Sequence, residues 1–290
     1  PIEDMEAYRA RLTRMFSSAG MLTRPVFGAA KASSRKRIAY AEGEDPRVLR
    51  AAQIAIDDEL AVPMLVGRPS VIEARIAKAG LRLKIGENVT CVNPDDDPRF
   101  RQYWQTYHQI MGRRGVSPEA AKAAVRRSNT LIASRMLRRG EADGMLCGLV
   151  GRYDSHLEHV RTVIGMKPGM RTMAAMNALM LDEHTLFIAD TYVNEEPSAE
   201  ELCDIAVMAS AEVRRFGFPP KVAFLSHSVF GSSQRASARR MRSARDLFVQ
   251  RCPDIECDGE MQGDAALSDS VRRSHLPQTT LSGSANLLVL

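Results

Sequence analysis

Short apolar segments alternate with longer amphipathic segments along most of the chain, and this alternation restricts the possible fold more than any other feature. Apolar runs at residues 37–41 and 62–66 are each followed by a stretch with apolar side chains at helical spacing, at 46–57 and 69–79. Strands that alternate with helices form mostly parallel sheets. We therefore predict an α/β protein, with two such sheets because the chain has 290 residues.

The same reasoning places elements along the rest of the chain. Helices are predicted at 98–113, 117–138, 155–164, 198–216 and 234–250, and strands at 144–147, 221–225, near 255 and at 286–290. Residues 172–181 and 184–190 are predicted to form a hairpin of two strands. Residues 2–17 have apolar side chains at helical spacing, and 17–37 read as a linker. A leading helix before a linker suggests attachment to an upstream domain.

Composition and charge exclude several classes of protein. Apolar residues make up 44% of the chain and charged residues 26%, as in globular proteins, and we expect neither a membrane span nor secretion. The net charge of +5 is spread among acidic residues, so nucleic-acid binding stays only a residual alternative. The five cysteines contain no CxxC pair and indicate reduced thiols in a cytoplasmic protein. No His/Cys cluster has metal-ligand spacing, so no metal site is expected.

Both ends of the sequence suggest a piece of a longer chain. The first residue is Pro1 rather than methionine, and the chain stops on the apolar run 286–290, which is predicted to be a buried strand. A complete fold does not normally finish on a core strand. We therefore expect native sequence on both sides of this chain.

The first candidate site is the segment 148–161, where a predicted strand leads through a glycine loop into a helix. A helix N-terminus presents free N–H groups and a partial positive charge, which suits a phosphate. Arg152 and Arg161 would add positive charge. Ser155 and Glu158 have the spacing of a capping box, so an ordinary capped helix explains the segment equally well. The phosphate-loop and dinucleotide fingerprints are not present.

The second candidate site follows the predicted strand 221–225. Several hydroxyl side chains, a glycine and a helix start in residues 226–233 make a second possible anion site. The adjacency of Ser226 and His227 also suggests a hydrolase. However, the GxSxG motif is missing, and a catalytic triad cannot be built from sequence neighbours.

The third candidate site is acidic. Asp258, Glu260 and Asp264 lie at the end of a predicted strand, where carboxylates can act as acid and base or bind magnesium. They can equally cap the next helix and pair with arginines. The spacing alone favours this structural interpretation.

Taken together, short segments of this chain resemble the phosphate acetyltransferase (phosphotransacetylase) family. The similarity runs from about Arg37 to Leu290, in the same order throughout. The matching segments are 42–45 with Arg47, 142–144, 155–161, 190–200, 225–232, 258–266 and 283–286. The segments 151–156, 225–233 and 258–266 look like the C-terminal module of the large bacterial malic enzymes, and residues 1–32 look like the connector before that module.

The resemblance implies two α/β/α subdomains of the phosphotransacetylase or isocitrate-dehydrogenase-like type, with an acyl-CoA and phosphate site in the cleft between them. It implies a connector at 1–35, a first subdomain at 36–148 whose C-terminal part is missing from this chain, and a dimerising second subdomain at 149–290. The residues expected to bind acetyl-CoA or phosphate are Arg152, Ser155, His156, Arg161, Ser226, Ser228, Gly231, Ser232 and Asp264. The helices and hairpin of residues 149–250 are the expected interface of a dimer or larger homo-oligomer.

Departures from the family pattern bear on function. Val229 and Phe230 stand where the enzymes usually have Thr and Lys, and His156 stands where they usually have Thr. The family's catalytic residues lie in a C-terminal segment outside this chain, so no catalytic residue is expected in it. A cleft with fewer donors would bind acetyl-CoA without exchanging its acyl group.

The resemblance therefore implies a regulatory, acetyl-CoA-binding and oligomerising domain of an NAD(P)-dependent malic enzyme. The upstream domain of that enzyme would carry the nicotinamide cofactor, Mg²⁺ or Mn²⁺, and the malate site. Acetyl-CoA would act as an effector through coupling between two sites. The alternative is an active phosphate acetyltransferase, which converts acetyl-CoA and phosphate to acetyl phosphate and CoA.

Overall fold

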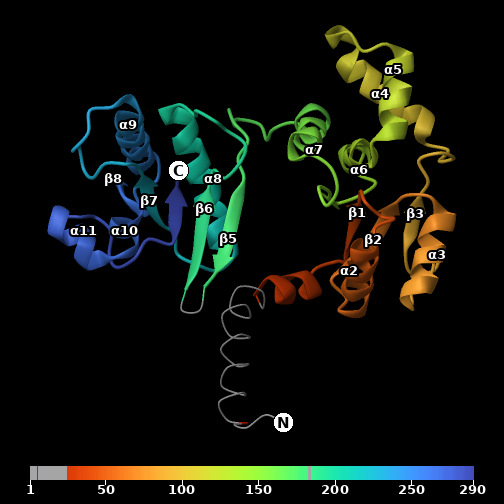
Figure 1. Ribbon diagram of the computed structural model, residues 1–290, viewed down its shortest axis with the longest axis horizontal. Helices are drawn as coiled ribbons and strands as arrows, with labels where there is room; N and C mark the ends of the chain where they lie inside the picture. Colours follow the sequence, from red (N-terminus) through yellow and green to blue (C-terminus); the bar gives the residue numbers. More distant parts are fainter. Residues whose placement is uncertain (1–4, 6–24, 182–183) are drawn as a thin grey trace. The chain divides into compact units, whose positions relative to one another are not determined.

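The structure is a computed structural model that describes Met5, residues 25–181 and residues 184–290. Residues Phe27–Gly165 and Met166–Leu290 form two compact units, here called the first and the second unit (Figure 1). Each contains a sheet whose strands are all or mostly parallel. The chain is therefore an α/β protein with mostly parallel sheets, as the alternation of segments predicts.

The sheet of the first unit has the strand order β3-β2-β1-β4, and all neighbouring strands are parallel. Its strands are β1 (Lys36–Tyr40), β2 (Ala61–Val66), β3 (Thr90–Val92) and β4 (Gly144–Leu146). Its helices are α2 (Pro46–Asp57), α3 (Pro69–Ala79), α4 (Phe100–Met111), α5 (Pro118–Arg127), α6 (Asn129–Arg138) and α7 (Tyr153–His159).

Helices cover both faces of this sheet. Tyr40 and Leu65 pack in one apolar cluster with residues of α2 and α3. Their strand neighbours Ala39 and Met64 pack in a second cluster with residues of α4, α5 and α6. Successive side chains of a strand point to opposite faces, so these short strands are apolar on both sides.

The predicted helix at 117–138 is in fact two helices. Ser128 adopts an extended backbone, and its side chain accepts a hydrogen bond from the N–H of Leu131, which caps the start of α6. Ser117 caps α5 in the same way, next to Pro118 in the first turn. Ser128 interrupts the helix because its hydroxyl competes for backbone N–H groups.

The two compact units divide after Gly165. The predicted helix at 155–164 begins at Tyr153 as α7 and continues as a π-helical turn, Val160–Ile164. Both pieces contact α6, and Val163 is fully buried in the same apolar cluster as that helix. The segment 149–165 therefore belongs to the first unit.

The sheet of the second unit has the strand order β5-β6-β9-β7-β8, in which β5 is antiparallel to β6 and all other pairs are parallel. The predicted hairpin is thus confirmed. The strands are β5 (Met176–Met180), β6 (Thr185–Ala189), β7 (Lys221–Leu225), β8 (Glu256–Met261) and β9 (Leu287–Val289). The helices are α8 (Ala199–Arg215), α9 (Ala236–Arg251), α10 (Gly263–Leu267) and α11 (Asp269–His275).

The second unit is also layered. Phe187 and Phe224 pack in a cluster with residues of α8 and α9 on one face of the sheet. Leu186, Ala223 and Leu288 pack in another cluster with residues of α10. The sequence prediction omitted β3, α10 and α11, each of which is seven residues or shorter.

The start of the chain differs in part from the prediction. Residues 25–32 are helical, although they fall in the predicted linker at 17–37. Ala29, Ala30 and Ala32 have high helix propensity, which outweighs the single Gly28. The helix predicted at 2–17 lies outside the described residues except for Met5. Among the described helices, none is long and apolar enough to cross a membrane.

Candidate functional site

In α/β proteins with parallel sheets, ligands bind beyond the carboxyl ends of the strands. In the second unit, the loops at this edge begin with Asp190 after β6 and Ser226 after β7 (Figure 1). Glu260 lies one residue before the end of β8. This edge therefore collects polar residues from segments that are far apart in the sequence.

Glu260 organises the loop that follows β7. Its side chain is fully buried, and its Oε1 accepts hydrogen bonds from the Ser228 hydroxyl at 2.6 Å and the Gly231 N–H at 2.9 Å. Arg242 on α9 donates to the same oxygen at 3.0 Å and forms an ion pair with it. The Phe230 N–H donates to the Glu260 carbonyl at 2.8 Å. The loop thus folds around a buried carboxylate.

Other polar groups of this loop bond within it. The Ser232 hydroxyl oxygen accepts from the Val229 N–H at 3.0 Å, and His227 Nε2 lies 3.1 Å from the Ser233 hydroxyl. Ser226 differs, because its hydroxyl is buried and has no hydrogen-bond partner in the described part of the chain. Ser226 is therefore a buried hydroxyl of this loop whose hydrogen-bonding capacity the described residues leave unused.

The other two acids of the third candidate site have separate roles. Asp258 is buried and accepts from the Thr279 hydroxyl at 2.6 Å and the Thr280 N–H at 3.0 Å. Asp264 is exposed and accepts from the Ala265 N–H at 2.7 Å, at the start of α10. These contacts are structural, but they are not the predicted helix cap, because α10 has Gln262 at its N-cap and no side-chain cap. Over residues 25–181 and 184–290, no three His, Cys, Asp or Glu side chains are grouped so that they could hold a metal ion.

Asp190 folds the turn after β6. Its Oδ2 accepts from both the backbone and the side-chain N–H groups of Asn194, each at 2.7 Å, and its Oδ1 accepts from the Ala175 N–H at 2.8 Å. The side-chain oxygen of Asn194 in turn accepts from the Thr172 hydroxyl at 2.9 Å. This network fixes the loop at the carboxyl end of β6.

The predicted capping box of the first candidate site is wrong. The helix α7 begins at Tyr153 with Arg152 at its N-cap and no side-chain cap, so Ser155 lies inside the first turn with an exposed side chain. The Glu158 carboxylate instead accepts from the Thr162 hydroxyl at 2.9 Å. The prediction failed because the helix starts two residues before the serine. Arg152 and Arg161 are both exposed.

His156 connects the glycine loop to α6. Its Nδ1 lies 2.8 Å from the Thr130 hydroxyl, and its Nε2 lies 2.9 Å from the Val150 carbonyl oxygen. A carbonyl can only accept, so Nε2 donates to Val150, while the Thr130 hydroxyl can pair with Nδ1 as donor or acceptor. The contacts of His156 are therefore structural. Burial lowers the pKa of the neighbouring His159, which favours the neutral form of that ring.

A cavity of about 290 Å³ opens at the carboxyl ends of β1 and β4 in the first unit. The strand order reverses between these two strands, which is the usual place for a ligand in such a sheet. Glu42 lines the cavity and accepts from the Gly148 N–H at 2.9 Å. Burial, together with the Glu42 charge, raises the pKa of the lining Cys147, which favours the protonated thiol. The remaining lining residues are mostly apolar: Tyr40, Arg47, Val48, Ala51, Leu146 and Leu149.

The expected binding residues therefore form two groups, one in each unit. Arg152, Ser155, His156 and Arg161 lie on or beside α7 in the first unit, and Ser226, Ser228, Gly231, Ser232 and Asp264 lie at the carboxyl edge of the second unit. The sequence analysis did not identify Arg242 as a site residue, because nothing in α9 marks it as the partner of Glu260. The cavity residues after β1 and β4 could have been identified from the sequence, because they directly follow predicted strands.

A comparison with protein-family models matches residues 21–290 to the family described as phosphate acetyl/butaryl transferase. The chain belongs to this family. The phosphotransacetylase of Streptococcus pyogenes has the same fold, with a TM-score of 0.82 and 26% sequence identity over 94% of this chain and 80% of that chain.

Curated relatives of this transferase-family chain include larger proteins. The NADP-dependent malic enzyme of Salmonella typhimurium is 49% identical over 100% of this chain. The NAD-dependent malic enzyme of Rhizobium meliloti is 45% identical, also over 100% of the chain. The chain spans 38% of the length of each of these two relatives. It is thus similar to one phosphotransacetylase-like part of a malic enzyme.

Proposed function

We propose that this chain is a regulatory domain that binds acetyl-CoA and mediates oligomerisation in a cytoplasmic NAD(P)-dependent malic enzyme. In this proposal residues 1–35 connect it to an upstream domain. That domain carries the nicotinamide cofactor and Mg²⁺ or Mn²⁺, and it oxidises malate to pyruvate. The residues proposed to bind acetyl-CoA are the basic residues of α7 in the first unit and the loop after β7 in the second unit.

The observation that carries the proposal is that the hydrogen-bond donors around Glu260 already donate to its carboxylate. Acyl exchange with phosphate requires fixed donors aimed at the developing oxyanion. In this chain the Ser228 hydroxyl, the Gly231 N–H and the Arg242 guanidinium all point to one carboxylate oxygen. Groups that already bond a buried anion are poorly placed to stabilise a second one.

The residues at the family's Thr and Lys positions support the same conclusion. Val229 and Phe230 supply neither a hydroxyl nor a cation, and the Phe230 ring packs against the apolar cluster under α10. Ser226, with its unbonded buried hydroxyl, remains to contact a ligand. Binding without turnover is what a sensor of acetyl-CoA requires.

The experiment measures binding and turnover on one preparation of the full-length protein that contains this chain. Isothermal titration calorimetry should detect acetyl-CoA binding, while a thioester assay with acetyl phosphate and CoA should show no formation of acetyl-CoA. The variant Ser226→Ala should weaken binding by about three- to tenfold, the value of one hydrogen bond. The matched variant Ser243→Ala changes an exposed serine of α9 and should leave binding unchanged.

The alternative function is an active phosphate acetyltransferase, which is favoured by the family match over residues 21–290. Robust formation of acetyl-CoA in the thioester assay would establish that alternative. Failure of acetyl-CoA to bind would overturn both functions.

A further inference from the structure

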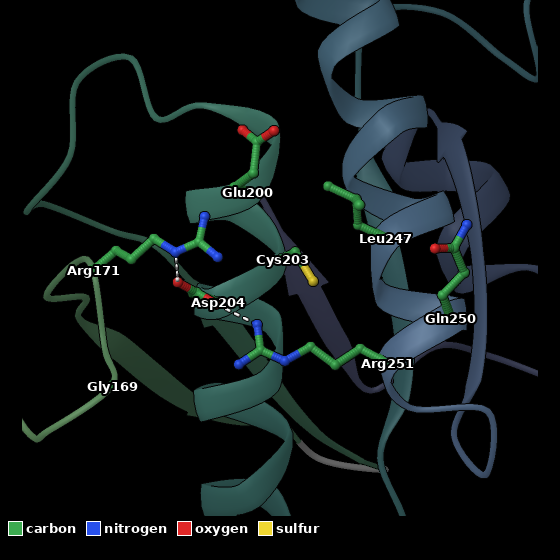
Figure 2. Close-up of a pocket in the computed structure, with 8 residues that line it drawn as sticks. All are labelled: Gly169, Arg171, Glu200, Cys203, Asp204, Leu247, Gln250 and Arg251. Carbon is green, nitrogen blue, oxygen red and sulfur yellow. Dashed lines mark hydrogen bonds and ion pairs between the residues drawn. The ribbon is translucent and has the colours of Figure 1, made fainter.

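A second cavity, which is lined mainly by polar residues, lies within the second unit. It does not include the residues proposed above to bind acetyl-CoA. Its volume is about 360 Å³, near the lower end for ligand pockets. It lies between α8, α9 and the segment at 169–171, so it does not depend on the first unit (Figure 2). The lining residues are Gly169, Arg171, Glu200, Cys203, Asp204, Leu247, Gln250 and Arg251.

Asp204 is a buried carboxylate with one unsatisfied oxygen. The residue is 2% exposed, and its Oδ1 accepts a hydrogen bond from Arg251. Its Oδ2 lies 3.8 Å from Arg171 Nε, which is too far for a hydrogen bond, and it has no hydrogen-bond partner among the described residues. A buried acceptor without a donor is costly, so a ligand that brings a donor to this oxygen gains affinity.

The two arginines provide the complementary charge. Figure 2 shows their guanidinium groups on either side of Asp204. The side chains of Arg171 and Arg251 are 64% and 42% exposed, and the two cations share one carboxylate. Guanidinium groups present several N–H donors in a planar fork that fits a carboxylate. A ligand carboxylate can therefore bind them while its neighbouring group reaches Asp204.

The rest of the lining limits the ligand further. Glu200 and Asp204 balance the two arginines in charge, which disfavours a highly charged anion such as a phosphate ester. The Leu247 side chain and the Cys203 thiol, which burial keeps neutral by raising its pKa, form an uncharged part of the wall. The cavity therefore suits a small molecule that has one carboxylate, one donor and a short carbon chain.

We propose that this cavity binds a small carboxylic acid with a hydroxyl or ammonium group on the neighbouring carbon. The carboxylate lies against Arg171 and Arg251, and the hydroxyl or ammonium group donates to Asp204 Oδ2. This site is separate from the proposed acetyl-CoA site and does not require it.

The test uses three probes of equal carbon number on the 290-residue chain: L-lactate, L-alanine and propionate. Lactate and alanine carry a donor beside the carboxylate, and propionate does not. Calorimetry should show that lactate or alanine binds at least about tenfold more tightly than propionate. Propionate binds more weakly because it has no group that can donate the charge-assisted hydrogen bond to Asp204. Binding of lactate alone identifies a 2-hydroxy acid site, and binding of alanine alone identifies a 2-amino acid site.

A pair of variants locates the binding. Arg171→Met removes an exposed guanidinium and should weaken binding of the preferred probe by about tenfold or more. Arg214→Met removes an exposed arginine of α8 that pairs with Asp254 and should change binding by less than about twofold. The proposal is overturned if no probe binds at millimolar concentration, if propionate binds as tightly as the other two, or if Arg171→Met has no effect.

Discussion

Arg135 is a buried cation on α6 that forms no ion pair within the part of the chain that the structure describes. It is 1% exposed, and its Nε and Nη1 have no hydrogen-bond partner in the described parts of the chain. Burial lowers the pKa of its guanidinium, which means that the folded state holds the charge at a cost. Arg138, one turn later, is different because its Nη1 donates to the Val163 carbonyl at 2.6 Å.

The two arginines give opposite expectations for the same substitution. Arg135→Met removes a buried unpaired charge and keeps an apolar chain of similar length, so the free energy of unfolding should rise by about 1–4 kcal/mol. Arg138→Met should lower it by about 1 kcal/mol, because a hydrogen bond to a buried carbonyl is lost. Urea denaturation of both variants measures the difference. A loss of stability in Arg135→Met would indicate that an anion pairs with this residue in solution.

Ser155 and Glu260 illustrate what could be predicted about single residues. The spacing of Ser155 and Glu158 suggested a cap, but the helix begins at Tyr153 and the spacing has no structural role. Ser228 and Gly231 were expected at a binding loop, and they do lie at the carboxyl edge of the sheet. Their shared bond to Glu260 could not be predicted, because it joins residues about thirty positions apart through tertiary folding.

At the scale of elements, the loop after β1 is joined by hydrogen bonds to the start of α3. Gly43 donates to the Val66 carbonyl at 3.1 Å, and a Cβ at Gly43 would lie 2.8 Å from two backbone atoms of Val66, so only glycine fits this approach. The next residue, Glu44, accepts from the Arg68 N–H and Nε at 2.9 Å each, and from its Nη2 at 2.9 Å. Arg68 is the N-cap of α3, and its own side chain does not cap the helix.

This contact makes stability depend on pH. The hydrogen bonds from the Arg68 side chain lower the pKa of Glu44 from 4.5 to about 2. A carboxyl group whose pKa falls on folding stabilises the protein above its unfolded pKa, and this contribution is lost as the pH falls towards its folded pKa. Glu44→Gln should therefore cost about 1 kcal/mol or less at neutral pH, since Arg68 is largely exposed. The cost should vanish near about pH 2.

Urea denaturation of the chain and the Glu44→Gln variant at pH values between about 7 and 3 measures this difference. Glu87→Gln is the control, because Glu87 forms an exposed ion pair with Lys84. A difference for Glu44→Gln that does not shrink on acidification would contradict the role given to the Arg68 contact.

Most elements were predictable from the period of their apolar residues. The strand at 221–225 was predicted with its observed bounds, because a run of buried residues between two polar segments has a clear pattern. The missed strand β3 has three residues, and the β-branched Val89, Thr90 and Val92 were its only signal. The order of strands in each sheet could not be read from the sequence. The position of β9 between β6 and β7 depends on contacts between distant segments.

At the scale of the whole molecule, the two edges of the sheet in the second unit differ. Five of the six residues in the edge strand β8 are buried. The opposite edge strand, β5, exposes Leu179 and Met180, and Leu181 follows it. Exposed apolar side chains on an edge strand, which is paired on one side only, favour association with another chain. The proposed oligomer therefore has a candidate contact surface on β5.

The double variant Leu179→Lys/Met180→Lys tests this surface, because β5 points these two side chains to opposite faces and lysine opposes burial on either. Light scattering after gel filtration should show a dimer or larger assembly for the chain, and a shift towards monomer for the variant, with association weakened by at least about tenfold. Ile54→Lys/Val62→Lys is the matched control, since both residues are exposed and apolar but lie in the first unit. An assembly that persists in the β5 variant would exclude this strand as the contact, whereas a monomeric chain would remove oligomerisation from the proposed function.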